Sequence, residues 1–356
     1  MTSNETLGDL GERRIIREML VPRYGASSER FGDDCAVIPA AAHMEGALVV
    51  TTDPCPPPMA FRLGFKDEYF RGWLLATINL SDLAAAGAIP LGVVTSLQLP
   101  AETLVADFER LLDGLDACCA ASGVPVVGGN LKEAPSVDVS ATALGVVSGT
   151  PLTRSGARPG HDILVLGHLG SFWAGVLGVE RGLIERDARE PLLVNALTPA
   201  PKLQVGAQLR EASYLSACID NSDGLWPSLE QLGKASGVAM VVRSGDLQFS
   251  DGVEDVATGL GTDPVRLALG WGDWQLIATA HPRHRDAIED VAQAEGIELH
   301  IIGTVVEGTG VDLEHDGRQA PMLRLDSERF TPESWFGAGL DGYIDHLLTG
   351  PLQEAR

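Results

Sequence analysis

Aspartates recur within or beside short apolar runs of this sequence, and most of these segments also carry serine, threonine or asparagine. Carboxylate, hydroxyl and carbonyl oxygens together suit a hard divalent cation such as Mg²⁺. Because Mg²⁺ is usually shared with substrate phosphates, the set predicts a nucleotide site. The segments are Gly32-Asp33-Asp34, Thr51-Thr52-Asp53, Asn79-Leu80-Ser81-Asp82 and Asp220-Asn221-Ser222-Asp223-Gly224.

Each segment also has an ordinary structural explanation. Gly-Asp-Asp before a strand suits a plain turn, and Ser222 or Asp223 suits the N-cap of a helix that begins near Leu225. Asp82 is harder to explain in this way, since an ionised carboxylate in an apolar helix needs a partner. Each segment by itself is weak evidence for a metal site. The prediction of a metal and nucleotide site depends on the whole set in this order along the chain.

Two other segments have residue types that suit ligand contact. Gly128-Gly129-Asn130 follows an apolar run, and fits either a strand-to-loop site where backbone approaches a ligand or an ordinary turn. Arg154 is either a phosphate clamp or a solvated charge. The loop G-x-x-x-x-G-K-[ST] does not occur, and the G-x-G-x-x-G at Gly337–Gly342 follows no strand and suits a loop. His168 is isolated, so a solvated or core position is expected.

The hydrophobic pattern predicts the elements that position these residues, in two α/β halves. The Gly- and Pro-rich stretch Gly149–Gly160 predicts the boundary between them, giving domains 1–149 and 150–356. Expected strands lie at 35–39, 47–52, 91–99, 124–127, 137–147, 162–167, 238–243, 274–280 and 298–306. Expected helices lie at 5–20, 67–88, 101–122, 171–185, 203–213, 225–236 and 283–295, with a short one at the end of the chain.

Composition limits the class of protein. The 356 residues carry 26 Lys plus Arg and 49 Asp plus Glu, a formal charge of −23. A main role in coating nucleic acid or an anionic membrane is therefore excluded, because both require clustered positive charge. The five cysteines form no C-x-x-C pair, and the N-terminal residues lack the apolar core of a signal peptide. We therefore expect a cytoplasmic α/β enzyme with no nucleic-acid or membrane partner.

The ordered motifs resemble thiamine-monophosphate kinase and, more broadly, the aminoimidazole-ribonucleotide synthetase (PurM-like) superfamily. They are GDDCAV (32–37), TTD (51–53), NLSDLAAAGAIP (79–90), GGN (128–130), LTRSGARPG (152–160) and IDNSDGL (219–225). The resemblance covers roughly residues 5–340. It implies a two-domain α/β (α+β) fold in which the N-terminal domains of a homodimer form a shared β-barrel and hold ATP.

The resemblance also implies roles for individual residues. The Mg²⁺ ligands would be Asp34, Thr51, Thr52, Asp53, Asp82, Asp220 and Asp223. The nucleotide contacts would be Gly129, Asn130, Arg154 and Ser222. The acceptor-side positions would be Ala60, Gly272, Asp273 and Trp274. No general base is implied, because phosphoryl transfer depends on positioning and charge neutralisation.

Departures from the family pattern fall mainly on the acceptor side. The family has Gly-Gly-Asp where this chain has Asn130, which removes one negative charge from the expected metal site. Ala60 replaces a substrate-binding histidine, and Gly272 replaces a substrate-binding glutamate. We therefore expect an ATP- and Mg²⁺-dependent phosphotransferase with an altered small acceptor. The alternatives are a genuine thiamine-monophosphate kinase, an ATP-dependent ligase or dehydratase that activates a carbonyl as a phosphate, and a non-catalytic nucleotide-binding paralogue.

Overall fold

The computed structural model describes residues 6–10, 15–24, 47–325 and 339–354, which form two compact units. The first unit contains Met1–Leu83, Ala88–Pro151 and Leu197–Leu203, and the second contains the remaining segments, Ala84–Gly87, Leu152–Ala196 and Gln204–Arg356. The main crossing between the units follows Pro151. Two short segments, Ala84–Gly87 and Leu197–Leu203, belong to a different unit from the residues on either side of them. The predicted division at residue 149 did not include these segments.

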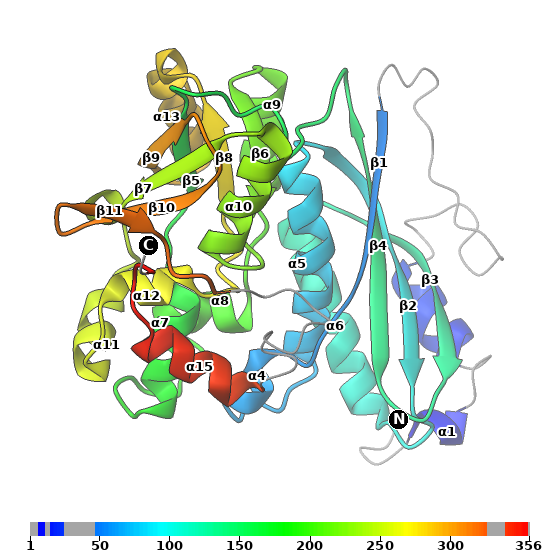
Figure 1. Ribbon diagram of the computed structural model, residues 1–356. Coiled ribbons are helices and arrows are strands. Elements are labelled where there is room, and N and C mark those ends of the chain that lie inside the picture. The colour runs from blue at the N-terminus through cyan, green and yellow to red at the C-terminus, as the bar shows by residue number, and fades with distance from the viewer. Residues whose placement is uncertain (1–5, 11–14, 25–46, 326–338, 355–356) are drawn as a thin grey trace. The chain divides into compact units, whose positions relative to one another are not determined.

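A four-stranded sheet forms the centre of the first unit (Figure 1). Its spatial order is β1-β4-β2-β3, with only β2 and β3 parallel. Buried and half-buried residues alternate along β4, as expected when one sheet face packs on a core. The strands are β1 (Ala47–Pro54), β2 (Ile89–Leu99), β3 (Val126–Glu133) and β4 (Asp138–Val147).

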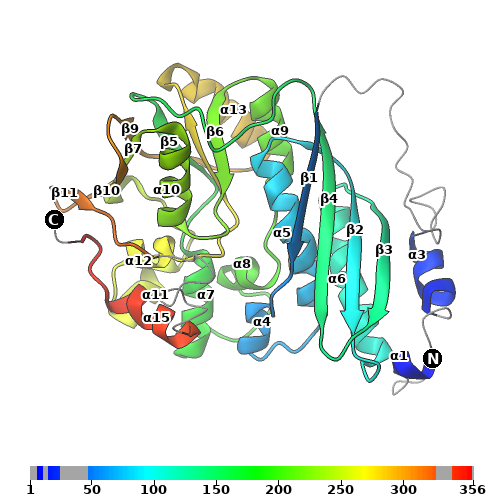
Figure 2. The same ribbon diagram turned by 45° about the vertical axis from the view of Figure 1, so that its right-hand side comes forward.

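Helices α5 (Tyr69–Ala85) and α6 (Val105–Ala121) cover one face of this sheet (Figure 2). Two glycines allow their backbones to touch. A Cβ on Gly72 would lie 1.8 Å from the Leu111 carbonyl oxygen, and one on Gly114 would lie 1.8 Å from that of Tyr69. Short helices α1 (Leu7–Leu10), η1 (Ile16–Leu20), α3 (Val21–Tyr24) and α4 (Met59–Arg62) complete the described part of the unit.

A mixed seven-stranded sheet forms the second unit, in the order β11-β10-β7-β9-β5-β8-β6. Helix α10 packs on β6, β7 and β10, and α13 packs on β9. The strands are β5 (Asp162–Leu166), β6 (Leu215–Asp220), β7 (Ala239–Arg243), β8 (Leu276–Ala280), β9 (Leu299–Val306), β10 (Gly310–His315) and β11 (Arg318–Pro321). The helices are α7 (Ser171–Glu180), η2 (Pro191–Leu193), α8 (Val194–Leu197), α9 (Leu203–Glu211), α10 (Leu225–Ser236), η3 (Ser244–Asp246), α11 (Val253–Leu260), α12 (Pro264–Leu269), η4 (Pro282–His284), α13 (Arg285–Ala294) and α15 (Leu340–Thr349).

At one edge of this sheet, the pairing of neighbouring strands brings four strand ends into line. Leu299, Leu166, Leu276 and Asp220 lie in one row across β9, β5, β8 and β6. The loops that leave this edge therefore include the Asp220–Gly224 segment and the loop after β5. Within the described ranges, none of the helices combines the length and the apolar character that a membrane span needs.

Candidate active site

In the first unit, the end of β1 meets the middle of α5. The Thr51 hydroxyl donates to Asp82 Oδ2 at 2.6 Å, and the Asp53 backbone N–H donates to Asn79 Oδ1 at 3.0 Å. Asn79 and Asp82 are three residues apart on α5 and therefore share one helix face. Sequence reasoning missed Asn79 as a site residue, although this spacing from Asp82 was a usable signal.

Thr52 lies on the other face of β1, because side chains alternate along a strand. Its hydroxyl donates to the Ala141 carbonyl oxygen and accepts from the Thr142 hydroxyl, both at 3.0 Å. The structure therefore brings the Thr51 hydroxyl, and not the Thr52 hydroxyl, to Asp82.

Gly129 and Asn130 lie within β3 rather than in a loop or turn, so that prediction was wrong. A Cβ on Gly129 would lie 2.3 Å from the Thr95 hydroxyl oxygen, which explains a glycine in a strand. Asp53, Ala141, Thr95 and Gly129 form one row across the sheet. At about 4.8 Å per strand, β1 and β3 are roughly 14 Å apart. Asn130 is therefore not brought to Asp53 within one chain.

Asp34 and Ala60 are two other predicted site residues of the first unit. Asp34 lies outside the described residues. Ala60 lies on α4 and has no exposed surface. Its methyl group is therefore part of the protein core.

In the second unit, β6 ends at Asp220 and its side chain anchors the next turn. The Ser222 hydroxyl donates to Asp220 Oδ1 at 3.0 Å, and Ser228 donates to the Asp220 carbonyl oxygen at 3.3 Å. Asp220 is buried and Asp223 is exposed. The N-cap of α10 is Gly224 at φ +105°, with no side-chain cap bond. The N-cap explanation for Ser222 and Asp223 is therefore wrong.

Arg154 lies beside α10 of the same unit. Its guanidinium donates to Gln231 Oε1 at 2.6 Å, and its backbone carbonyl oxygen accepts from the Ser236 hydroxyl at 3.3 Å. The side chain is exposed and Gln231 is neutral, so this contact leaves the positive charge of Arg154 uncompensated. An exposed guanidinium of this kind can bind an anion.

The Gly270–Leu276 segment adjoins the Asp220 turn through two backbone bonds, from Asn221 to Gln275 at 2.7 Å and from Gly272 to Ser222 at 3.1 Å. Asp273 within it is fully buried, and its carboxylate accepts from the backbone N–H groups of Gly170 at 2.6 Å and Phe172 at 3.0 Å. Burial raises the pKa of Asp273 to about 6, and these donors oppose the rise.

The backbone conformation of the Gly270–Leu276 segment explains why residue 272 is a glycine. Trp274 of the same segment is half-buried. Gly272 has φ +102°, and a Cβ there would lie 2.8 Å from the Phe172 ring. Trp274 also has a positive φ of 55°. A glutamate at position 272 therefore requires Phe172 and the backbone to move.

The donor atoms of the aspartate motifs in each unit fit Mg²⁺ and not a soft metal. Thr51 and Asp82 in the first unit, and Asp220, Ser222 and Asp223 in the second, offer oxygen ligands only. The four described cysteines are buried, and burial raises the pKa of each thiol, that of Cys118 to about 11. They are therefore inert packing residues.

Comparison with known proteins places the chain in a family. Residues 32–147 match the model of the AIR synthase related protein N-terminal domain, and residues 158–316 match that of its C-terminal domain. The chain belongs to the AIR synthase related family. This membership confirms the resemblance and the two-domain α/β fold, while the shared β-barrel stays a prediction.

Several similar proteins are named thiamine-monophosphate kinases. The thiamine-monophosphate kinase of Methanopyrus kandleri is 31% identical over 310 residues, covering 86% of this chain and 94% of the relative. The crystal structure of thiamine-monophosphate kinase from Stenotrophomonas maltophilia has a TM-score of 0.71 at 30% identity, covering 81% and 90%. The structure described as AaThiL complexed with AMPPCP and TMP has a TM-score of 0.65 at 28% identity, covering 89% and 97%.

Proposed function

We propose that this protein is an ATP- and Mg²⁺-dependent kinase that phosphorylates a small acceptor. The observation that carries the proposal is the Thr51–Asp82 pair, an oxygen cluster on two motifs of a chain similar to thiamine-monophosphate kinases. A related structure contains an ATP analogue, which supports ATP as the donor.

We assign residues of each unit a part in this reaction. In the first unit Thr51, Asp53 and Asp82 would hold Mg²⁺, and in the second unit Asp220 and Asp223 would each offer a carboxylate ligand to Mg²⁺. Mg²⁺ supplies charge neutralisation of the phosphates. Ser222 would donate to a phosphate oxygen, and the exposed Arg154 guanidinium would bind another. Because the transfer is in-line and depends on positioning, no side chain needs to act as a strong base.

The acceptor side supports a substrate other than thiamine monophosphate. Ala60 is fully buried, and Gly272 is held in a conformation that disfavours a side chain. At these two positions the chain lacks the substrate-binding histidine and glutamate that the family resemblance implies. Trp274, which is half-buried beside Gly272, is our candidate for an acceptor contact.

A direct assay separates the altered acceptor from the genuine thiamine-monophosphate kinase. Purified protein is incubated with Mg²⁺, labelled ATP and either thiamine monophosphate or a metabolite mixture. We expect label in a small phosphorylated product of the mixture and little thiamine diphosphate. Robust formation of thiamine diphosphate would exclude the altered acceptor and leave the kinase proposal intact.

The same assay distinguishes the other classes of enzyme. Free phosphate together with a new C–N bond would indicate a ligase. Activity that appears only after Asn130→Asp would indicate a degenerate site, because the substitution restores the missing carboxylate. No observation on the described residues favours either class, and the similar proteins of Methanopyrus kandleri, Mycobacterium tuberculosis and Stenotrophomonas maltophilia are named thiamine-monophosphate kinases.

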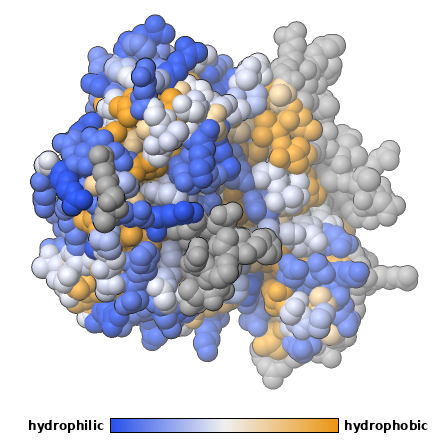
Figure 3. All heavy atoms as spheres, in the orientation of Figure 1, coloured by the Kyte–Doolittle hydropathy of each residue, from blue (hydrophilic) through white to orange (hydrophobic). Residues whose placement is uncertain are grey.

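We also propose that the protein is a homodimer joined through the exposed face of the first unit's sheet. Leu48, Val50 and Ile89 are 53%, 53% and 54% exposed, and they align with Val146 and Leu144 on β4. Figure 3 shows apolar residues gathered on the surface over β1 and β4. An exposed apolar face of this kind marks an association surface.

Sedimentation of the wild type and of Val50→Asp tests the dimer. We expect a dimer for the wild type and a folded monomer for the variant, because a charge at an exposed position disrupts association without disturbing the core. A monomeric wild type would contradict the proposal.

A further inference from the structure

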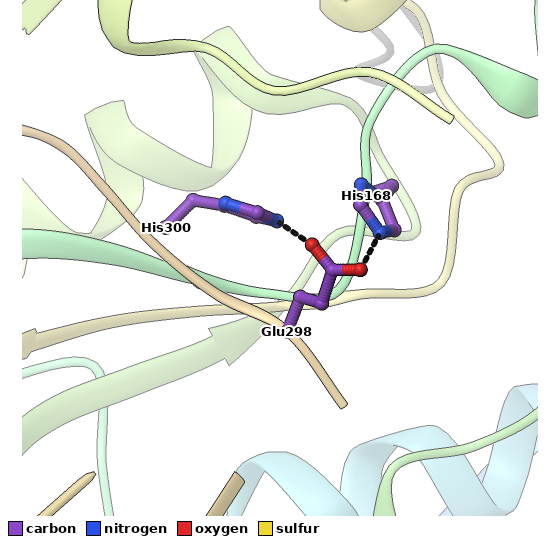
Figure 4. A group of neighbouring side chains, drawn as sticks. All are labelled: His168, Glu298 and His300. Carbon is purple, nitrogen blue, oxygen red and sulfur yellow. Dashed lines mark ion pairs between the residues drawn. The ribbon is translucent and has the colours of Figure 1, made fainter. Parts of the chain in front are cut away.

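Two histidines and a glutamate of the second unit converge, although they are far apart in sequence. His168 Nε2 lies 3.3 Å from Glu298 Oε1, and His300 Nε2 lies 3.8 Å from Glu298 Oε2. One donor atom from each of the three residues lies within 4.8 Å of the other two. The carboxylate lies between the two rings (Figure 4). His168, which is isolated in the sequence, therefore has neighbours of its own in the fold.

The backbone fixes the positions of all three residues. His168 lies in the loop between β5 and α7, Glu298 directly precedes β9, and His300 pairs with Val165 of β5. The Gly167 N–H donates to the Glu298 carbonyl oxygen at 2.8 Å, which ties the loop to β9. The donors therefore come from two segments that are already joined.

A simple ion pair explains this arrangement poorly. The His300 side chain is 11% exposed, and its Nε2 is buried with no hydrogen-bond partner among the described residues. An imidazole nitrogen has a lone pair that a metal can accept, and the buried Nε2 of His300 is in position to supply one.

We propose that His168, Glu298 and His300 bind a borderline divalent transition cation, of which Zn²⁺ is the representative. Two imidazole nitrogens and a carboxylate are a recognised Zn²⁺ ligand set, whereas Mg²⁺ prefers oxygen ligands alone. Bond lengths of about 2.0–2.1 Å require donor atoms about 3.3 Å apart, which the His168–Glu298 pair already shows. Glu298 is 67% exposed, so water can occupy a fourth position.

The cation would join the β5–α7 loop to β9. That loop ends at Gly170, whose N–H donates to Asp273 at 2.6 Å. Binding at His168 would thus hold the segment that begins α7. The site shares no residue with the predicted Mg²⁺ ligands, and the proposal does not depend on the kinase activity.

Calorimetric titration of Zn²⁺ into chelator-stripped, full-length protein tests the proposal. Saturating Mg²⁺ is present throughout, so that the oxygen-only sites are filled. We expect one Zn²⁺ per chain for the wild type, and at least about tenfold weaker binding for Glu298→Gln. Glu298 is exposed, so this variant should fold, which circular dichroism verifies.

Glu307→Gln is the matched control, since it makes the same change at an exposed position beyond the other end of β9. It should bind Zn²⁺ as the wild type does, and His168→Asn should weaken binding as Glu298→Gln does. The proposal is overturned if the wild type binds no Zn²⁺ with Mg²⁺ present. It is equally overturned if Glu298→Gln binds as the wild type does, or if Glu307→Gln is weakened to the same extent.

Discussion

The segments Asp220–Gly224 and Gly270–Leu276 lie side by side in the second unit, yet their aspartates have opposite environments. Asp273 is fully buried and accepts two backbone N–H groups at the start of α7. Asp223 is exposed. A buried carboxylate that accepts from backbone donors stabilises the fold, whereas an exposed one can bind a cation. Both residues are acidic members of motifs, and only their surroundings separate the two roles.

The largest effect expected from this comparison is on stability. Asp273→Ala leaves two buried N–H groups without their acceptor, which should cost about 3–4 kcal/mol and lower the Tm by about 6–12 °C. Asp223→Ala should leave the Tm unchanged, because the side chain is exposed. Differential scanning calorimetry measures both. Equal Tm values for the two variants would contradict the distinction between a structural Asp273 and an exposed, cation-binding Asp223.

A pH dependence should follow from the raised pKa of Asp273, about 6 in the folded protein against 3.8 unfolded. The folded state then binds the proton more tightly, so the contribution to stability is present below about pH 4 and is lost as the pH rises through 6. Relative to Asp273→Asn, wild-type unfolding free energy should fall by about 3 kcal/mol across this window. Denaturant titrations at several pH values measure the difference, and a constant difference would contradict the account.

For the exposed Asp223, the expected effect is on cation binding and not on stability. Asp223→Asn should weaken Mg²⁺-dependent ATP binding by about 10–100-fold while the Tm stays unchanged, because only a cation ligand is altered. Asp273→Asn should leave the affinity of the folded protein within about threefold of wild type. Isothermal titration at a temperature where both variants are folded separates these outcomes. Loss of affinity in Asp273→Asn alone would reverse the assignment.

The smallest effect should arise at Gly272. Gly272→Ala places a methyl group against Phe172 at a positive φ, which should cost about 1–3 kcal/mol. The double variant with Phe172→Ala should be less than additive, because the ring contact is shared. Thermal unfolding of the single and double variants tests this coupling, and strict additivity would count against it.

Much of the local fold followed from the sequence pattern. The helix expected at 225–236 has the bounds of α10, and the strand expected at 298–306 corresponds to β9. Strands β6, β10 and β11 and helices α11 and α12 were not expected, because short apolar runs do not separate strand from helix. The glycines of β3 suggested a loop, and the close contact with Thr95 explains Gly129.

The site was predictable as a set of motifs and not as a set of contacts. Asp82 was expected to need a partner, and Thr51 provides it. The partners of Asp273 are more than 100 residues upstream, at Gly170 and Phe172, so nothing near Asp273 in sequence indicated its structural role. The His168–Glu298–His300 group depends on strand pairing in the same way.

The most direct test of the kinase assignment is isothermal titration of a non-hydrolysable ATP analogue into the wild type and Asp82→Asn, with and without Mg²⁺. We predict binding by the wild type only when Mg²⁺ is present, and a loss of at least about tenfold in affinity for Asp82→Asn. Asp107→Asn, an exposed change on α6, is the control and should match the wild type. Wild-type binding that is absent or independent of Mg²⁺, or an Asp82→Asn variant that binds normally, would contradict the account.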